Sequence, residues 1–274
     1  PIHLINVDLS RSDLVLRPVI APAGQRYTMQ QFVKAHRPLA AINGTFFDTL
    51  TGVTVGNLVS KGRLLTEGMA GSNLVFRRNG RIELISSGRN LGRYQDFADA
   101  DFAIGGGPTL LADGEYVVDP RSEGFRDPAL FRPRPRTAMG VTSEGQLRMV
   151  VVTQGVTLWT LAHIMKDLGC VHALNLDGGS SSAMTVGGTT MVAPHRRLTN
   201  MVGVFTVGKD ADLGRVDVDV LDLVVRVPGR DLPGRAREEV AGLREVREAL
   251  EVVVAAAVRG RPREGAVRRR QREA

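Results

Sequence analysis

The sequence predicts an α+β fold in which a mixed, mostly antiparallel β-sheet core is flanked by a few helices. Short apolar runs separated by glycine fill most of residues 1–155, as expected for strands and tight turns. Hairpin signals join several of these runs, and Asn79-Gly80 is the clearest of them. Two other segments repeat apolar residues at helical spacing. Hairpins interleaved with a few helices are typical of the α+β class.

The expected strands alternate apolar and polar residues or form short apolar runs between turn residues. They are residues 3–9, 14–19, 57–60, 64–65, 73–77, 82–85, 109–111, 116–118, 138–142, 147–152 and 173–176.

Two helices are expected among these strands. Thr28 and Gln31 have the spacing of a capping box, and Pro38 ends the helix that follows them. Thr157 has the position of an N-cap for the second helix, which Gly169 ends. The apolar stripe of this second helix is expected to pack in the core.

Composition divides the chain into two expected parts, residues 1–208 and residues 209–274. The first part contains all the segments above and forms the predicted globular domain. The second part is an appendage rich in Arg, Val and Glu, in which residues 235–259 have the periodicity of one amphipathic helix. Such a helix packs on a domain, pairs with a partner or lies on a membrane surface, and the sequence leaves these alternatives open.

The net charge of +7 does not indicate a nucleic-acid-binding protein. Only residues 259–272 form a basic run, and this run contains no aromatic residue that would stack on bases. We therefore expect no nucleic-acid partner, whereas a mildly positive field suits an anionic substrate. No apolar run has the length of a transmembrane segment. The sequence does not indicate an oligomeric state.

The distribution of cysteine, histidine and glycine indicates neither a metal nor a cofactor. Cys170 is the single cysteine, so we expect a small buried side chain and no internal disulfide. The 5 histidines are scattered without the spacing of a metal site. The three glycines at residues 105–107 lack the spacing of a dinucleotide fingerprint. We expect there either backbone that closely approaches a site or a bulge where a strand and a hairpin meet.

Residues 173–182, with the sequence ALNLDGGSSS, are the most informative segment. Asp177 directly follows an apolar strand and precedes Gly178 and Gly179, which allow backbone to come close to a ligand. Ser180 and Ser181 supply adaptable hydrogen bonds. This pattern favours a site for a polar, oxygen-rich substrate, and the alternative is an ordinary surface turn.

Two other segments place polar groups at strand ends. Residues 41–48 run from an apolar strand through Asn43 to Asp48, and residues 134–141 bring Arg136 and Thr137 into the start of another strand. The proline-containing residues 116–136 are loop-like and form either a rim of the site or an ordinary surface loop.

These segments, with residues 104–111 and 197–204, resemble the phosphodiester glycosidase family in their order and spacing. The resemblance covers roughly residues 1–207. It implies a hydrolase that cleaves the glycosyl C1–O bond of sugar-1-phosphodiesters resembling N-acetylglucosamine-1-phosphodiester, in a glycan or glycolipid. It also implies an extracellular or cell-envelope location. The chain lacks the cysteine-rich context of vertebrate members, so their receptor-trafficking roles are not transferred.

Such a reaction needs a carboxylate beside the sugar and positive charge beside the phosphate. A phosphate monoester has a second pKa near ~6, so it leaves without full protonation, and charge stabilisation matters most. We assign catalytic roles to Asp177 as the carboxylate, Arg136 as the phosphate ligand, and Asn43. The residues expected to bind substrate are Asn175, Gly178, Gly179, Ser180, Ser181, Thr137, Gly106, Asp48, Arg197 and Asn200, of which Asp48 is a candidate second carboxylate.

The sequence leaves other roles open for these residues. Arg136 is alternatively an ion-pair partner of Asp177, and Asn43 is alternatively the cap of the following turn. Arg197 and Asn200 alternatively stabilise the final strand only. The whole protein is alternatively a hydrolase of other glycosidic or phosphodiester bonds in envelope polysaccharide, or a non-catalytic glycan-binding envelope protein. Turnover separates the binding protein from both enzymes.

Overall fold

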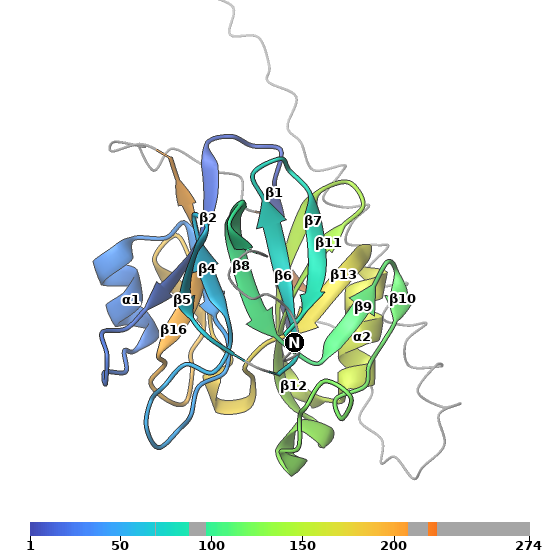
Figure 1. Ribbon diagram of the computed structural model, residues 1–274. Helices are drawn as coiled ribbons and strands as arrows, with labels where there is room; N and C mark the ends of the chain where they lie inside the picture. The colour runs from blue at the N-terminus through green and yellow to red at the C-terminus, as the bar shows by residue number, and fades with distance from the viewer. Residues whose placement is uncertain (69, 88–96, 208–218, 224–274) are drawn as a thin grey trace, which may run out of the picture. The chain divides into compact units, whose positions relative to one another are not determined.

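The structure is a computed structural model that describes residues 1–68, 70–87, 97–207 and 219–223. Its strands form three sheets, and two α-helices accompany them (Figure 1). All pairings between the described strands are antiparallel. The predicted α+β class is therefore confirmed.

The largest sheet has 7 strands in the order β10-β9-β13-β11-β12-β1-β17. Their bounds are β10 Glu115–Tyr116, β9 Thr109–Ala112, β13 Cys170–Asn175, β11 Arg134–Thr142, β12 Gln146–Val156, β1 Ile2–Asp8 and β17 Asp219–Leu223. Strands from both ends of the described chain meet in this sheet, because β1 pairs with β12 on one side and with β17 on the other.

The two other sheets have 5 strands each, in the orders β15-β14-β3-β16-β2 and β5-β4-β8-β6-β7. The bounds in the first are β15 Thr189–Val192, β14 Met184–Val186, β3 Ala40–Asn43, β16 Asn200–Thr206 and β2 Leu14–Ile20. The bounds in the second are β5 Arg63–Thr66, β4 Leu58–Ser60, β8 Ala100–Gly106, β6 Ser72–Arg77 and β7 Ile82–Ser86.

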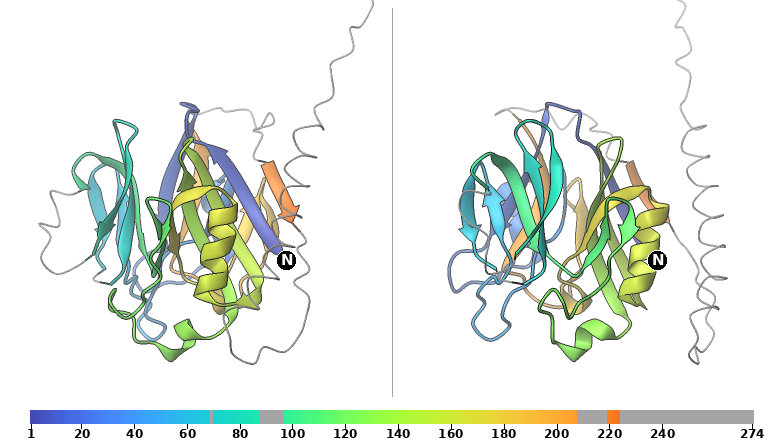
Figure 2. Two further views of the ribbon diagram at one scale, coloured as in Figure 1. Left: turned by 90° about the vertical axis from the view of Figure 1, so that its right-hand side faces the viewer. Right: turned by 45° about the vertical axis from the view of Figure 1, so that its right-hand side comes forward.

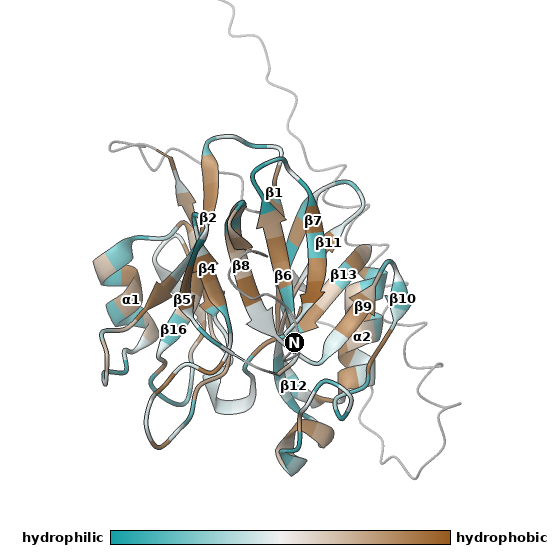
Figure 3. Ribbon diagram, viewed as in Figure 1, coloured by the Kyte–Doolittle hydropathy of each residue, from teal (hydrophilic) through white to brown (hydrophobic). Residues whose placement is uncertain are grey.

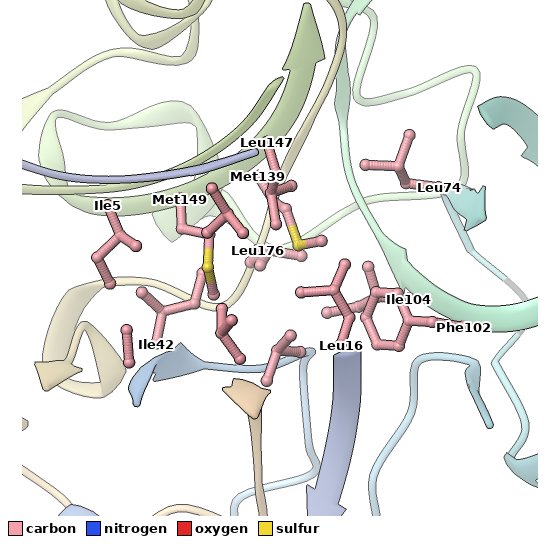
Figure 4. Close-up of a cluster of buried hydrophobic side chains, with 14 of the residues drawn as sticks. Ile5, Leu16, Ile42, Leu74, Phe102, Ile104, Met139, Leu147, Met149 and Leu176 are labelled. Atoms are coloured by element: carbon pink, nitrogen blue, oxygen red, sulfur yellow. The ribbon is translucent and has the colours of Figure 1, made fainter. Parts of the chain in front are cut away.

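One hydrophobic core joins the three sheets. Ile5 and Met149 of the seven-stranded sheet, Ile42 of the second sheet, and Leu74 and Ile104 of the third belong to the same buried cluster (Figure 4). Among these strands, β6 and β8 show clearly apolar stretches (Figure 3). Burial of this apolar surface is the main favourable term for folding, so the three sheets are expected to fold together.

Each α-helix packs on the strands with its apolar residues. Helix α1 (Met29–His36) begins with the predicted capping box of Thr28 and Gln31, and its Met29 and Phe32 are buried. Helix α2 (Leu158–Asp167) has Thr157 as its N-cap and lies along the seven-stranded sheet, where it contacts β9 and β13 (Figure 2). Both N-caps were predicted from the sequence and are confirmed.

The segment expected to be loop-like, residues 116–136, contains more regular structure than predicted. A short 3₁₀ helix, η2 (Pro128–Phe131), lies within it, and β11 already begins at Arg134. Pro135 lies at a register shift between β11 and β12, a position where a residue without an N–H group is tolerated in a sheet. Arg136 is therefore held within a strand.

The appendage expected at residues 209–274 lies mostly outside the described residues, and so does its predicted helix at 235–259. Its described portion, β17, extends the seven-stranded sheet beside β1. Among the residues that the structure describes, no helix has the length and apolarity needed to cross a bilayer.

Candidate active site

The three sheets meet where β3, β8 and β13 end. Asn43, the last residue of β3, donates from Nδ2 to the backbone oxygen of Asp177, just beyond β13, at 2.6 Å. Gly107, just beyond β8, donates its N–H to the backbone oxygen of Asn175 at 2.7 Å. A Cβ on Gly106 would lie 2.8 Å from that same oxygen, so the close approach of β8 to β13 requires glycine there.

A cavity of about 340 Å³ lies at this junction. Its lining includes backbone and side chains from the ends of all three sheets, aromatic rings, two carboxylates and three arginines. The aromatic residues are Phe46, Phe47 and Phe125, the carboxylates are Asp127 and Asp177, and the arginines are Arg134, Arg136 and Arg196. The cavity is thus a polar site with apolar walls, as small-molecule sites commonly are.

Asp177 is the buried carboxylate of this cavity, with only 8% of the residue exposed. Its Oδ1 accepts from the Gly178 N–H at 2.9 Å, and its Oδ2 accepts from Nη2 of Arg196 at 2.8 Å. Burial raises its pKa above the ordinary value of 3.8, and Arg196 and the Ser181 hydroxyl oppose that shift. The carboxylate is therefore desolvated but has a cationic partner.

Asn43 lies beneath Asp177 and has no hydrogen-bonding capacity left. Besides the bond to Asp177, Nδ2 donates to the Gly44 oxygen at 3.4 Å. Oδ1 accepts from the Thr137 hydroxyl at 2.9 Å and from the Ala183 N–H at 3.0 Å. An amide has two donors and two lone pairs, so all four positions are filled. Asn43 and Thr137 therefore hold the site together from beneath.

Arg136, the expected phosphate ligand, is 1% exposed and is held by backbone carbonyls. Its Nε donates to Val156 at 3.2 Å, and its Nη2 donates to Leu130 at 2.8 Å and to Arg132 at 2.9 Å. Burial, and then the nearby charge of Arg134, lowers its pKa to about 10. Arg136 thus stays charged at neutral pH, and most of its guanidinium is already bonded within the protein.

Arg196 is a site residue that the sequence analysis did not identify. It pairs with Asp177, its Nε donates to the Ser181 hydroxyl at 2.5 Å, and its guanidinium lies 4.6 Å from the ring centroid of Phe47. The expected residue was its neighbour Arg197. Arg196 lies in a bend of the chain after β15 and lines the cavity, whereas Arg197 does not line it.

Arg134 is the second cavity arginine missing from the sequence analysis. It stands two residues before Arg136 at the start of β11, where alternate residues share a face, and this spacing is the signal that would have found it. Its guanidinium lies over Gly179, since a Cβ on that glycine would come within 2.2 Å of Nη2. Gly179 has a φ of +62°, a left-handed backbone conformation that favours glycine in this turn.

Ser180 and Asp48 lie beside the cavity rather than in its lining. Ser180 is half-buried in the 3₁₀ turn η3 (Gly179–Ser181), and its carbonyl accepts from His195. Asp48 is exposed and accepts hydrogen bonds from the N–H groups of Leu50 and Thr51, which close a local turn. These hydrogen bonds, with Thr51 as the largest cause, lower the pKa of Asp48.

Arg197 and Asn200 also bond within the protein. Arg197 is exposed, and Nη1 lies 3.5 Å from both the Arg26 carbonyl and Oε1 of Gln31. Asn200 is buried, and its amide pairs with the backbone of Thr45, accepting at 2.8 Å and donating at 3.2 Å. Asn200 thereby fixes the backbone that carries part of the cavity wall.

Two side-chain oxygens of cavity-lining residues are buried without a hydrogen-bond partner. They are Oγ1 of Thr45 and Oδ1 of Asn175, whose Nδ2 donates to Gly107 at 2.7 Å. Leaving a buried polar atom unpaired costs about 1–3 kcal/mol. Both oxygens are therefore buried hydrogen-bond acceptors that the protein itself leaves unpaired.

The fold and the site together define a class of protein: an α+β domain in which a buried carboxylate and several arginines share one cavity where three sheets meet. A family model described as phosphodiester glycosidase matches residues 36–205. The chain belongs to the phosphodiester glycosidase family, which confirms the resemblance drawn from the sequence motifs.

Curated relatives share part of this chain. The mouse N-acetylglucosamine-1-phosphodiester alpha-N-acetylglucosaminidase is 28% identical over 172 residues, which are 56% of this chain and 33% of that protein. The bovine protein of the same name is 27% identical over 62% of this chain and 35% of its own length. The chain thus spans about a third of the length of these relatives.

Solved structures share the fold. The catalytic domain of zebrafish N-acetylglucosamine-1-phosphodiester alpha-N-acetylglucosaminidase, auto-inhibited by its pro-peptide, has a TM-score of 0.60 and 23% identity, covering 70% of this chain and 73% of that one. A hypothetical protein from Synechocystis has a TM-score of 0.57 and 18% identity, covering 76% and 59%.

Proposed function

We propose that this protein is a hydrolase that cleaves the C1–O bond of a sugar-1-phosphodiester, with an N-acetylglucosamine-1-phosphodiester as the model substrate. The observation that carries the proposal is the placement of one buried carboxylate, Asp177, in the same cavity as three arginines. A glycosyl centre needs the negative group, and a departing phosphate needs the positive ones. The names of the curated relatives support the same substrate class.

In the proposed reaction, the oxygen of a water molecule bonds to C1 of the sugar. The C1–O bond to phosphorus breaks, and its electron pair stays on the phosphate oxygen. The products are a free sugar and a phosphate monoester, and the proton lost by water passes to that monoester or to solvent. Asp177 stabilises the oxocarbenium-like centre at C1, directly or as a nucleophile.

The leaving group explains why one buried carboxylate suffices in this proposal. A phosphate monoester has its second pKa near ~6, so it departs at neutral pH without a strong general acid. Asp127, the other lining carboxylate, is exposed and caps η2 by accepting from the Ala129 N–H at 2.8 Å. Asp177 and the arginine charges are thus assigned the main catalytic contribution.

We assign the sugar to the side of the cavity that holds Thr45 and Asn175. Their unpaired oxygens are fully buried, so a small movement of either side chain is needed before it accepts a hydrogen bond from a sugar hydroxyl or an acetamido N–H. Phe46 and Phe47 line the same cavity and offer apolar surface to the sugar ring.

On the family resemblance alone, we further propose that the substrate is a glycan or glycolipid outside the cytoplasm, and that residues 1–208 suffice for catalysis.

The test is to incubate the purified protein with UDP-N-acetylglucosamine and with methyl N-acetylglucosamine-1-phosphodiester, and to measure free N-acetylglucosamine. Asp177→Asn is the variant that removes the proposed carboxylate. Asp113→Asn is the matched control, because it makes the same chemical change at an exposed residue in the turn between β9 and β10. Circular dichroism spectra would verify that both variants fold.

Release of sugar by the wild type and by Asp113→Asn, but not by Asp177→Asn, would support the proposal. If neither these substrates nor a panel of other glycosyl phosphodiesters is cleaved, the enzyme is not a phosphodiester glycosidase. Titration with the uncleaved sugars would then test the alternative that the cavity only binds glycans.

A further inference from the structure

The three arginines of the cavity differ in how they are bonded. Arg136 donates to three backbone carbonyls, and Arg196 donates to Asp177 and Ser181. Arg134 lines the same cavity, and in the described part of the chain its guanidinium has no hydrogen-bond or ion-pair partner. An arginine carries five N–H donors, so Arg134 retains its full capacity to bind an anion.

The guanidinium of Arg134 lies against the turn that follows Asp177. Nη2 and Nε of Arg134 would lie 2.2 Å and 2.9 Å from a Cβ on Gly179, so the guanidinium rests directly on that glycine. Gly178 and Gly179 are the residues after the carboxylate in sequence. The guanidinium of Arg134 thus lies against Gly179, which follows Asp177 by two positions in the sequence. This places an unbonded cation beside the proposed reaction centre.

Among the described residues, Arg134 forms no ion pair, and Asp127, the other carboxylate that lines the cavity, is exposed. The Asp177 carboxylate already pairs with Arg196. The buried neighbour of Arg134 is another cation, and the charge of Arg134 is one of the two causes that lower the pKa of Arg136. Two neighbouring guanidinium groups without a shared carboxylate favour binding of an anion between or beside them.

We propose that Arg134 directly binds the phosphate oxygens of the substrate, and that Arg136 is the buried positioning residue behind it. The chemical class of the ligand is a singly charged phosphodiester or, after the reaction, a phosphate monoester. A planar guanidinium binds two phosphate oxygens at once, which would orient the scissile C1–O bond over the turn after Asp177. The assignment rests on the proposed function for the identity of the substrate, but the anion site itself does not require turnover.

The first experiment measures binding of inorganic phosphate by isothermal titration calorimetry at low salt. The proteins are the wild type, Arg134→Ala, Arg134→Lys and Arg132→Ala. Arg132→Ala is the matched control, since this exposed side chain stands two residues away and only its carbonyl serves Arg136. We expect Arg134→Ala to weaken phosphate binding about 10- to 100-fold, as for loss of charge-assisted hydrogen bonds, and Arg134→Lys to weaken it less.

The second experiment compares two substrates of the same variants. Arg134→Ala should lower kcat/KM for methyl N-acetylglucosamine-1-phosphodiester by a similar factor. It should lower kcat/KM much less for the aryl glycoside 4-nitrophenyl N-acetyl-α-glucosaminide, because the leaving group of that substrate has no phosphate. A structural role for Arg134 would instead reduce turnover of both substrates equally.

The outcomes separate this inference from the proposed function. If wild type does not bind phosphate, or if folded Arg134→Ala binds it as tightly as wild type, the inference is wrong even when the diester is cleaved. If phosphate binding depends on Arg134 while no phosphodiester is cleaved, the anion site stands and the proposed reaction fails. An equal loss of phosphate binding in Arg132→Ala would show a general charge effect and would also overturn the inference.

Discussion

The polar residues beside the turn after β13 differ from two polar residues of the cavity wall in how completely their side chains are hydrogen-bonded. Beside the turn, Asn43 fills all four of its hydrogen-bonding positions and Asn200 bonds to backbone groups. Arg136 lines the cavity but likewise bonds to backbone groups. In the wall, Thr45 and Asn175 each hold a buried oxygen without a partner. Both sets are polar, and both follow or begin strands.

This difference shows that a polar residue at a strand end has one of two roles. A side chain whose bonds are all made within the protein stabilises the fold and fixes its neighbours. A side chain with unused donors or acceptors next to a cavity has capacity for a ligand. Sequence motifs do not separate the two, and the following predictions do so by measuring activity and stability in the same variants.

The largest expected effect is on activity, from Asp177→Asn. Loss of the carboxylate should lower kcat about 100- to 10,000-fold, the range typical for a positioned acid–base group. The free energy of unfolding, measured with urea, should change far less than the activity, because an amide of the same shape replaces a buried charge. A variant that unfolds as it loses activity would place Asp177 with the structural set.

The next effect is on stability, from Asn43→Ala. The substitution leaves the Asp177 carbonyl, the Ala183 N–H and the Thr137 hydroxyl without this partner, at a cost of about 1–3 kcal/mol for each group that stays unpaired. Urea denaturation would measure it. Asn79→Ala, in the exposed hairpin turn, is the matched control and should cost no more than about 1 kcal/mol, because it removes a single exposed hydrogen bond from the Arg81 N–H.

A smaller effect on stability is expected from two threonine variants, Thr137→Val and Thr45→Val, which should differ from each other. Thr137→Val removes a hydroxyl that donates to Asn43, so the protein should lose about 1 kcal/mol of stability. Thr45→Val removes a hydroxyl that has no partner, so stability should be unchanged or slightly higher. Thermal unfolding of both variants would test this, and equal destabilisation would mean that Thr45 also belongs to the bonded set.

The smallest effect is a shift in pH dependence. Burial raises the pKa of Asp177 above 3.8, so kcat/KM should fall on the acid side with an apparent pKa above that value. Arg196 opposes the shift, so Arg196→Gln should move this acid limb to higher pH. Arg197→Gln removes the same charge from the exposed neighbour and should move the limb less. Equal shifts would refute a specific pairing of Asp177 with Arg196.

The same pKa predicts how stability changes with pH. The folded state holds the Asp177 proton more tightly than the unfolded chain does, so this group favours folding below 3.8. That contribution is lost as pH rises from 3.8 through the raised pKa. Asp177→Asn should remove this part of the pH dependence, which urea titrations at several pH values would detect.

The fold was largely predictable because its signals are local. The capping box of Thr28 and Gln31 and the hairpin turn at Asn79-Gly80 depend on residues close in sequence, and both form as expected. The strand bounds differ on both sides of the register shift at Pro135, where β11 begins at Arg134 rather than 138 and β12 ends at Val156 rather than 152. A bulge of this kind depends on the partner strand, which the local sequence does not reveal.

The site was predicted only in part because its contacts are long-range. Asp177 was found from the strand and the glycines that follow it. Arg196 was missed in favour of Arg197, since the side that faces Asp177 depends on the path of the chain after β15. Arg134 was missed although its spacing from Arg136 placed it on the same strand face, and the sequence does not show that its guanidinium has no bonding partner among the described residues.

The hydrogen bond between Asn43 and Asp177 joins residues that are 134 positions apart in the sequence. Strand β1 pairs with β12, which follows it in the sequence at a similar separation. A ribosome adds about 5–20 residues each second, so the first strands of the nascent chain remain without their partners for roughly ten seconds or longer. The turn that carries the carboxylate cannot be held in place until the second half of the domain has been made. A fragment ending before β13 would therefore be inert, and the appearance of activity would report that the domain has finished folding.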